Sequence, residues 1–224
     1  MLSERDYMHE VSVKPRWSAT IAILVLNVLV FAIQYGVGRF FPEYPFDDRF
    51  ALSLEGMKSG YVWQLLTYQF MHASFWHIFF NSWAIFMFGR EVELYLGKAR
   101  MLALYFTSGV AGGLLQVLGT WLLPQHFGDG AVVGASAGAF GLVTAYAVLF
   151  PDRVLILLLF FVLPVKMRAK TLLWVSLAMA VVGVIVPFGN IAHAAHLGGI
   201  LSGYVFSRLA IQRFRTAPRP NQFY

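Results

Sequence analysis

A run of small residues surrounds a single hydroxyl in Gly134-Ala135-Ser136-Ala137-Gly138-Ala139-Phe140-Gly141, and an uncharged apolar segment continues from it to Phe150. Small side chains let the backbone of another helix, or of a bound peptide, come close to Ser136. Such stretches commonly serve helix packing in membranes, and serine is a frequent member of them. This stretch alone therefore favours packing. A second stretch, Ala195-His196-Leu197-Gly198-Gly199, changes that balance.

The composition is typical of a membrane protein. Of the 224 residues, 58% are hydrophobic and only 12% are charged, which predicts one integral membrane domain with short tails. The formal net charge of +6 does not indicate nucleic-acid binding, because the cations lie beside apolar segments as topology signals do. The absence of cysteine excludes disulfides and thiol catalysis. The first apolar run has no convincing cleavage site, so we expect an uncleaved span.

The apolar segments predict an all-α polytopic membrane protein with six transmembrane helices. We expect a polar tail over residues 1–17, a membrane domain over residues 18–211 and a second tail over residues 212–224. Residues 36–70 form a long polar connection that we expect to fold against the membrane surface. The expected spans, compared with the about 20 residues that cross a bilayer, are Ser18–Tyr35, Met71–Phe88, Met101–Leu123, Gly134–Phe150, Thr171–Val186 and Ile191–Phe206.

The segment Val154–Val165 is ambiguous. Its apolar run is too short to cross a bilayer unaided, Pro164 lies near its end, and Arg153 and Lys166 flank it. We expect a hydrophobic connection buried at the membrane surface or among helices. The basic residues support this interpretation. With six spans and both tails cytoplasmic, 14 of the 17 Lys and Arg side chains lie inside, whereas a seventh span would leave 7 inside and 10 outside.

The six-span topology brings four polar side chains to a similar depth. In it the second, fourth and sixth spans run from outside to inside, so Ser136, His196, His77 and Asn81 lie roughly 5–15 Å below the outer ends of their helices. A seventh span would move His196 to the cytoplasmic half, out of reach of Ser136. The topology that charge favours is therefore also the one in which a serine can meet a histidine.

This placement would allow nucleophilic catalysis. A serine hydroxyl is a poor nucleophile unless a base takes its proton, and histidine titrates near neutrality. His77 and Asn81 are four residues apart, so both project from one face of their helix as candidate oxyanion donors. A polar packing cluster is an equal alternative, because a lone Ser or Asn commonly bonds a neighbouring helix. Ionisable groups inside a membrane are costly, however, and favour function.

A metal site is disfavoured, and we expect no cofactor. His193 and His196 have a spacing that can hold a metal, but no carboxylate or cysteine accompanies them in the sixth span. No His-Glu-x-x-His motif occurs. His72 lies nearer the outer surface, where it either lines the site or caps its span. His9 and His126 have ordinary positions in a tail and a loop.

Four motifs together resemble the rhomboid intramembrane serine proteases. In chain order they are Phe70-Met71-His72, His77-Ile78-Phe79-Phe80-Asn81, Gly134-Ala135-Ser136, and Ala195-His196-Leu197-Gly198-Gly199 with Gly203 four residues on. Each motif is weak alone, whereas their order, spacing and placement on six spans are specific. The resemblance covers nearly the whole chain and is to the minimal six-helix bacterial form.

The resemblance implies a role for each site residue. Ser136 would be the nucleophile and His196 its general base, in a dyad with no carboxylate. Asn81, His77 and the Ser136 backbone N–H would form the oxyanion hole. Supporting positions would be Gly134, Phe140, Gly199, Gly203 and His72.

The resemblance also implies how the helices are arranged. Ala195, Gly199 and Gly203 recur every four residues, and this stripe would let the sixth span pack tightly on the fourth. Glu93 resembles the family's acidic residue at the inner end of the second span, with a structural role. The fifth span and the loop Pro187–Ala192 would form a mobile gate for substrate.

Three positions depart from the family pattern. Ala137 stands where the family often has Gly after the serine, and Phe140 stands where it often has Tyr. The family's Trp-Arg pair in the first loop is Trp63-Gln64 here. The last departure concerns how that loop is anchored, and the first concerns the space at the oxyanion site.

The function implied is an endopeptidase that cleaves transmembrane segments of membrane proteins. It would lie in the bacterial inner membrane with both termini cytoplasmic and its active site open to the outer face. Its partners would be transmembrane protein substrates and the lipid bilayer, without nucleic acid or metal. One alternative is a catalytically silent rhomboid-like protein that binds membrane proteins. Another is a small transporter with a histidine relay, which would be expected to show inverted repeats or broken helices in matched halves.

Overall fold

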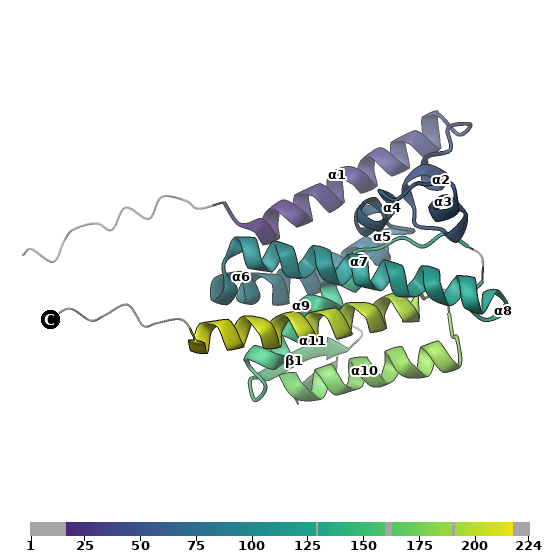
Figure 1. Ribbon diagram of the computed structural model, residues 1–224. Helices are drawn as coiled ribbons and strands as arrows, with labels where there is room; N and C mark the ends of the chain where they lie inside the picture. Colours follow the sequence, from purple (N-terminus) through teal and green to yellow (C-terminus); the bar gives the residue numbers. More distant parts are fainter. Residues whose placement is uncertain (1–16, 129, 160–162, 190, 217–224) are drawn as a thin grey trace, which may run out of the picture.

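The computed structural model describes residues 17–216, apart from 129, 160–162 and 190. Six long helical segments form a bundle in this part of the chain (Figure 1). The second segment is continuous from Phe75 to Leu96 and consists of α5 (Phe75–Ala84), the π-helix η2 (Ile85–Gly89) and α6 (Arg90–Leu96). The others are α1 (Ala19–Phe40), α7 (Lys98–Leu122), α9 (Ser136–Leu149), α10 (Ala169–Ile185) and α11 (His193–Thr216).

Two described helices are long and apolar enough to cross a membrane. They are α1, with a mean hydropathy of 2.2 over its most apolar window, and α7, with 1.6. The helices α9 and α10 are also apolar but have only 14 and 17 residues. The helical class of the fold is therefore as expected, while the count of six membrane spans stays a prediction.

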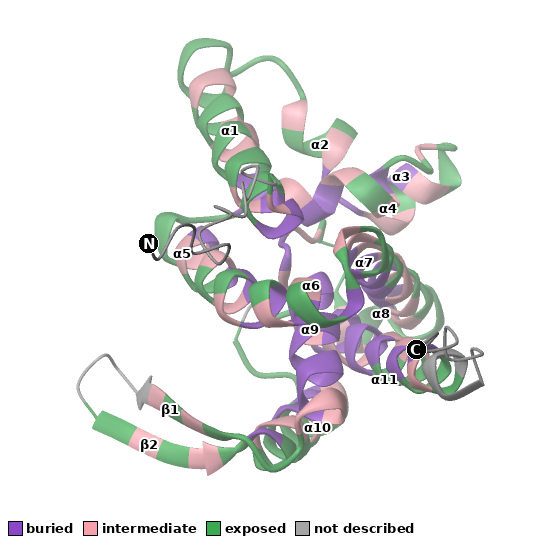
Figure 2. Cartoon of the chain, turned by 90° about the vertical axis from the view of Figure 1, so that its left-hand side faces the viewer, coloured by how far each residue is buried: buried purple, intermediate pink, exposed green. Residues whose placement is uncertain are grey.

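The central helix of the bundle is α9. Ten of its 14 residues are buried, and α7, α10, α11 and η2 all pack against it. Figure 2 shows it as a mostly buried ribbon in the middle of the helices. A helix enclosed on all sides needs no polar stripe, which explains why the apolar run from Ser136 to Leu149 contains no charge.

The helices α9 and α11 touch through their backbones. A Cβ atom on Gly199 would overlap the Ala137 carbonyl group, and one on Gly203 would lie 2.7 Å from the Gly141 carbonyl oxygen. Backbone atoms cannot move aside as a flexible side chain can, so only glycine allows this approach.

The helix α7 also approaches α11 through close backbone contacts. A Cβ atom on Gly112 would lie 2.5 Å from the Ala195 carbonyl oxygen. One on Gly198 would lie 2.8 Å from the Ala111 carbonyl oxygen. The small residues of α11 therefore serve two neighbours, α9 and α7, where the sequence suggested only the first.

Helix ends follow capping residues more closely than hydropathy. The Ser74 side chain accepts a hydrogen bond from the His77 N–H at 3.2 Å, so α5 begins at Phe75, four residues after the expected start of the span. At the other end of the chain, α11 continues to Thr216, beyond the expected boundary at residue 211. Residues 1–16 and 217–224 of the two expected tails lie outside the described residues.

The second expected span ends at Phe88, but the helix continues beyond that residue. α6 extends to Leu96, and the chain turns only at Gly97, whose φ of +83° suits glycine. The sequence of α6 combines good helix formers with buried Val92 and Leu96 on one side. The helix therefore extends beyond the end of the apolar run, which was used to predict where the helix ends.

The first loop folds into short helices at one end of the bundle (Figure 1). Buried Gln64 holds it in place, because its side chain accepts a bond from the Ser53 N–H at 3.2 Å and donates one to the Asp48 carbonyl at 2.9 Å. Gln64 thus anchors the loop at the position where the family often has Arg. The short helices are α2 (Phe46–Phe50), α3 (Leu54–Lys58), α4 (Gln64–Thr67) and η1 (Tyr68–Phe70), and α8 (Pro124–Phe127) follows α7.

The ambiguous segment is a β-hairpin. β1 (Val154–Leu159) pairs antiparallel with β2 (Leu163–Arg168), with Val154 opposite Arg168 and Leu159 opposite Leu163. The hairpin projects from the bundle (Figure 2), and Val154 and Leu163 are 60% and 57% exposed. It does not lie among the helices as one of our two expectations had it. β-branched residues and a leucine run too short for a span form a strand pair instead.

Glu93 on α6 caps the N-terminus of α1. Its carboxylate accepts hydrogen bonds from the Ser18 and Thr20 hydroxyls at 2.7 Å and from the Ala19 and Thr20 N–H groups at 2.9 Å. Burial would raise the pKa of Glu93, but these hydrogen bonds outweigh it and hold the pKa below its usual range. Glu93 lies beyond the expected second span, and its contact is a structural link between two helices.

Replacing Glu93 by Gln should lower the free energy of unfolding by about 1–2 kcal/mol, because an anionic cap at a helix N-terminus is lost. The folded pKa lies below the unfolded value of about 4.3. The stabilisation is therefore complete above that pH and disappears as pH falls through the folded pKa. Thermal unfolding in detergent at several pH values measures this. The parent and variant should converge in acid, and the exposed Glu43→Gln variant should match the parent throughout.

Replacing Gly203 by Ala should destabilise the fold by about 1–3 kcal/mol, because the new methyl group meets the α9 backbone. Gly38→Ala on α1 is the matched control, since no atom lies within 4 Å of a Cβ there. It should leave stability unchanged or slightly raised. Equal melting temperatures for the two variants would contradict the close packing of α9 and α11.

Candidate active site

Ser136 and His196 lie side by side, although 60 residues separate them. Ser136 is the first residue of α9, and His196 lies in the first turn of α11. Their Oγ and Nε2 atoms are 2.8 Å apart, which is hydrogen-bond distance. The contact between Gly199 and Ala137 lies next to this pair on both helices, so the close helix packing sets the distance between the two side chains.

Aromatic contact orients the imidazole of His196. The ring of Phe140, one turn along α9 from Ser136, has its centroid 4.5 Å from that of His196 at an angle of 42°. His193 lies on another side, with its ring centroid 6.2 Å from that of His196. Phe140 thus provides the ring at the position where the family often has Tyr.

Two hydrogen-bond donors on α5, the side chains of His77 and Asn81, lie next to the backbone that precedes Ser136. The Ala73 N–H donates to His77 Nδ1 at 3.4 Å, which assigns the ring proton of a neutral His77 to Nε2. A Cβ atom on Gly134 would lie 2.7 Å from His77 Nε2 and 3.6 Å from Asn81 Nδ2. Both groups therefore lie over the backbone just before Ser136, where Gly134 has a φ of +133°.

Asn81 has a donor that no described residue uses. Its Nδ2 atom is buried and has no hydrogen-bond partner in the described part of the chain. An unpaired buried donor costs about 1–3 kcal/mol. Such a group is therefore suited to an oxygen atom that arrives from outside, such as the carbonyl of a bound peptide.

The N-terminus of α9 is also free of a side-chain cap. Ala135 precedes Ser136 and supplies no capping hydrogen bond. The first N–H groups of a helix have no partner within it, and the helix dipole makes this end partly positive. The Ser136 N–H is therefore a third donor next to the hydroxyl.

Ala137 does not narrow this space. A Cβ on Gly112 of α7 would lie 2.6 Å from the Ala137 methyl group, so that methyl faces α7. It is not among the residues that line the cavity beside Ser136. The departure from glycine after the serine is thus accommodated by a glycine on another helix.

The dyad and the α5 donors share one cavity of about 580 Å³. It lies between the start of α5, the start of α9 and the segments that precede α9 and α11. Its lining residues are Ala73, Ser74, His77, Asn81, Ala131, Val132, Val133, Ser136, Phe140, Ile191, Ala192 and His196.

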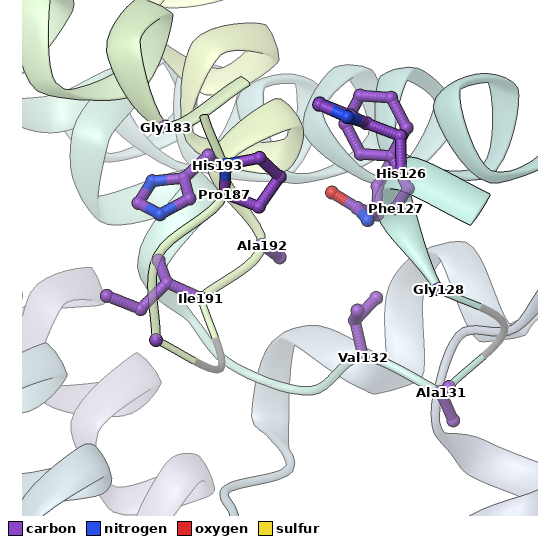
Figure 3. A pocket seen from close by; sticks show the side chains of 13 residues that line it. His126, Phe127, Gly128, Ala131, Val132, Gly183, Pro187, Ile191, Ala192 and His193 are labelled. Atoms are coloured by element: carbon purple, nitrogen blue, oxygen red, sulfur yellow. The ribbon is translucent and has the colours of Figure 1, made fainter. Parts of the chain in front are cut away.

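Figure 3 shows the residues of a second cavity. Its volume is about 390 Å³, and it adjoins the first cavity. Ala131, Val132, Ile191 and Ala192 line both. The sequence did not draw attention to its buried amide, Gln116 on α7, whose Oε1 has no partner among the described residues. A signal was present, because a polar side chain within an apolar span is costly and marks a candidate functional position.

Two histidines line this second cavity without joining the dyad. His193 contacts the Phe188 carbonyl through Nε2 at 3.1 Å. His126 contacts the Val184 carbonyl and so links α8 to α10. Within the described part of the chain, no group of three or more His, Cys, Asp or Glu side chains is placed to hold a metal ion.

His72 lies behind the site. It is only 1% exposed, its ring centroid is 5.1 Å from that of His77, and it is not among the residues that line the cavity of the dyad. Its Nδ1 contacts the Phe70 carbonyl at 3.2 Å, and its backbone N–H donates to Gln34 at 3.1 Å. His72 therefore does not line the cavity of the dyad, which was one of the two roles considered for it, and its ring packs beside that of His77 instead.

This arrangement suits acyl transfer. A serine hydroxyl lies against an imidazole, and three donors surround the space next to it. No carboxylate is among the described residues that line the cavity, so an imidazole acting here would do so without an acidic partner from that group. The predicted site residues other than His72, Gly199 and Gly203 either line the cavity or, as with Gly134, directly flank it.

Comparison with known proteins identifies relatives. A family model described as the rhomboid domain matches residues 59–213. The rhomboid protein YdcA of Bacillus subtilis is 34% identical over 160 residues, which cover 70% of this chain and 72% of YdcA. Rhomboid-like protease 1 of Toxoplasma gondii is 31% identical over 72% of this chain and 52% of that protein.

One relative is named as inactive. Inactive RHOMBOID-like protein 8 of Arabidopsis thaliana is 26% identical over 58% of this chain and 43% of its own length. The chain spans about half the length of the Toxoplasma relative and less than half of the Arabidopsis one. The matched domain covers more than half of the chain and contains every predicted site residue, and the chain belongs to the rhomboid family of integral membrane proteins.

Proposed function

We propose that this chain is an intramembrane serine endopeptidase that cleaves transmembrane segments of membrane proteins. The observation that carries the proposal is the 2.8 Å contact between Ser136 Oγ and His196 Nε2 in a cavity shared with Asn81 and His77. Asn81 Nδ2 is buried without a partner among the described residues, and Asn81 lines the same cavity as the dyad. The two observations together support a ligand-binding role over polar packing.

In the first half of the reaction, Ser136 Oγ attacks the substrate carbonyl carbon and its proton passes to His196 Nε2. The negative charge that forms on the carbonyl oxygen accepts hydrogen bonds from Asn81 Nδ2, His77 Nε2–H and the Ser136 N–H. His196 then returns the proton to the leaving amine as the C–N bond breaks. The product is an acyl-enzyme on Ser136 and a released peptide with a new amino terminus.

In the second half, water attacks the acyl carbon while His196 accepts its proton. The same donors hold the second oxyanion, and collapse of that intermediate returns the proton to Ser136 and releases a carboxylic acid. Water reaches the site through a cavity lined by protein, because a polar site in hydrocarbon is tolerated only where protein or water surrounds it. The substrate helix unwinds locally to expose its carbonyl, so helix-breaking or small residues near the cut favour cleavage.

The proposal includes a topology. We place the membrane domain at residues 18–211, both tails in the cytoplasm and the site open to the outer face of a bacterial inner membrane. The bias of basic residues supports this orientation. The positions of Ser136 and His196 at the same end of neighbouring helices are consistent with it. α10 and the loop that precedes α11 would form the substrate gate.

The alternatives are a silent family member that only binds membrane proteins and a transporter with a histidine relay. The first is supported by the name of the Arabidopsis relative. It differs from a protease in having no reactive serine. A fluorophosphonate probe should label Ser136 covalently, whereas absence of labelling in the folded protein would favour the silent form or the transporter.

Replacing Ser136 by Ala should lower cleavage of a reconstituted transmembrane substrate by at least about 10³-fold, because the acyl-enzyme cannot form. The melting temperature should stay close to that of the parent. Ser202→Ala on α11 is the matched control, since Ser202 lines a groove away from the dyad, and it should keep parental activity. Cleavage by Ser136→Ala at the parental rate would show that another group is the nucleophile.

Replacing Asn81 by Ala should lower kcat by about 10²–10³-fold with little change in KM, because the donor acts on charge that develops in the transition state. Asn27→Ala is the control for removal of a buried amide, since Asn27 is buried in α1 and does not line the cavity. An equal loss of kcat in both variants would indicate a packing role for Asn81.

A further inference from the structure

The two faces of the β1–β2 hairpin differ in chemistry. Residues directly opposite each other in an antiparallel pair share one face. One face therefore carries only apolar side chains, from the pairs Leu155–Met167 and Leu157–Val165. The other face, which we call the cationic face, carries Val154 and Ile156 on β1 beside Arg168 and Lys166 on β2.

The helical bundle leaves much of both faces uncovered. Val154 and Ile156 are 60% and 56% exposed, and the members of the apolar face are only half-buried. Figure 2 shows the hairpin projecting from the bundle on the side between α5 and α10. A two-stranded hairpin is at best marginally stable alone in water, so we expect a further surface to cover it.

Backbone hydrogen bonding limits how deep the hairpin can lie in a bilayer. The sheet has two strands, so in the described part of the chain the outer edge of each strand has no strand partner. Open sheet edges are not tolerated in the hydrocarbon core, because their N–H and C=O groups would be unpaired there. The interface is different, since headgroups and water can bond both edges.

The charges at the hairpin select among lipids. Arg153, Lys166, Arg168 and Lys170 face only two carboxylates, because Asp152 pairs with Arg168 and Lys170 and Glu91 pairs with Arg153. Lys166 lies on the cationic face, and no ion pair to it is found among the described residues. This excess of positive charge complements anionic headgroups.

We propose that the hairpin is an interfacial anchor for anionic lipid. Its apolar face contacts acyl chains, and Lys166 with Arg168 contacts lipid phosphates at the headgroup level. The hairpin continues directly into α10, and the Ala169 N–H bonds the Arg153 carbonyl at 2.9 Å. Lipid bound there therefore holds the first turn of α10 at the membrane surface.

The absence of cysteine from the chain allows a direct test with single-cysteine variants. An environment-sensitive fluorophore is attached at Val165→Cys on the apolar face or at Ile156→Cys on the cationic face. The full chain, carrying Ser136→Ala so that activity plays no part, is reconstituted in phosphatidylcholine vesicles with increasing phosphatidylglycerol. We expect the Val165 label to be quenched by lipids with nitroxides on their chains. The Ile156 label should lose access to aqueous iodide as phosphatidylglycerol increases.

Lys166→Gln should lower the equilibrium constant for the protected state about fivefold at a given fraction of phosphatidylglycerol, the effect of removing one cation near an anionic surface. High salt should weaken the protection in the parent. Lys58→Gln, an exposed cation on α3 far from the hairpin in the sequence, should change nothing. If Lys166→Gln does not fold, the labelled parent still tests whether protection depends on anionic lipid. Its protection is compared between vesicles of phosphatidylcholine alone and vesicles that contain phosphatidylglycerol.

Two outcomes would overturn the proposal. The first is full access of iodide to both labels at every lipid composition, which would place the hairpin in water. The second is protection that is absent with either lipid and appears only when a transmembrane substrate peptide is added. That result would make the hairpin a protein-docking surface. Neither outcome bears on whether Ser136 is the nucleophile, because the labelled protein lacks it.

Discussion

The contact between α11 and α9 is the constraint on which the site depends. Gly199 and Gly203 bring the α11 backbone against the carbonyl groups of Ala137 and Gly141. In a membrane, helices gain little from burying apolar side chains against each other, so close backbone packing is what holds them. That packing determines how far His196 lies from Ser136. A bulkier residue on either helix would separate the helices and break the 2.8 Å contact between the side chains.

The polar groups of the site are placed before any substrate arrives. Ser74 caps α5, the Ala73 N–H sets the tautomer of His77, and Phe140 orients His196. Asn81 keeps a buried donor without a partner among the described residues. Such a donor costs stability in the free protein, and it lowers the reorganisation needed when charge develops on a substrate oxygen. The fold thus tolerates an unfavourable group where the proposed chemistry would use it.

Several structural details could not be predicted from hydropathy. The end of α6 depends on the packing of Val92 and Leu96 and on the turn at Gly97. The link between Glu93 and the start of α1 joins residues more than 70 positions apart. The β1–β2 hairpin arises because a short apolar run can form a strand pair as well as a buried helix, and periodicity does not distinguish the two. Each of these outcomes depends on contacts between distant segments.

The sequence by itself determined the helical membrane class, the membership suggested by the four motifs, and the residues Ser136, His196, Asn81 and His77 as candidates. It could do so because apolar length, charge bias and residue spacing are local properties of the chain. Only the tertiary structure decided which groups meet. It placed His72 behind His77, turned the Ala137 methyl toward Gly112, and left a donor of Asn81 without a partner among the residues that the structure describes. The sequence alone could not determine these positions, because they depend on how closely separate helices approach each other.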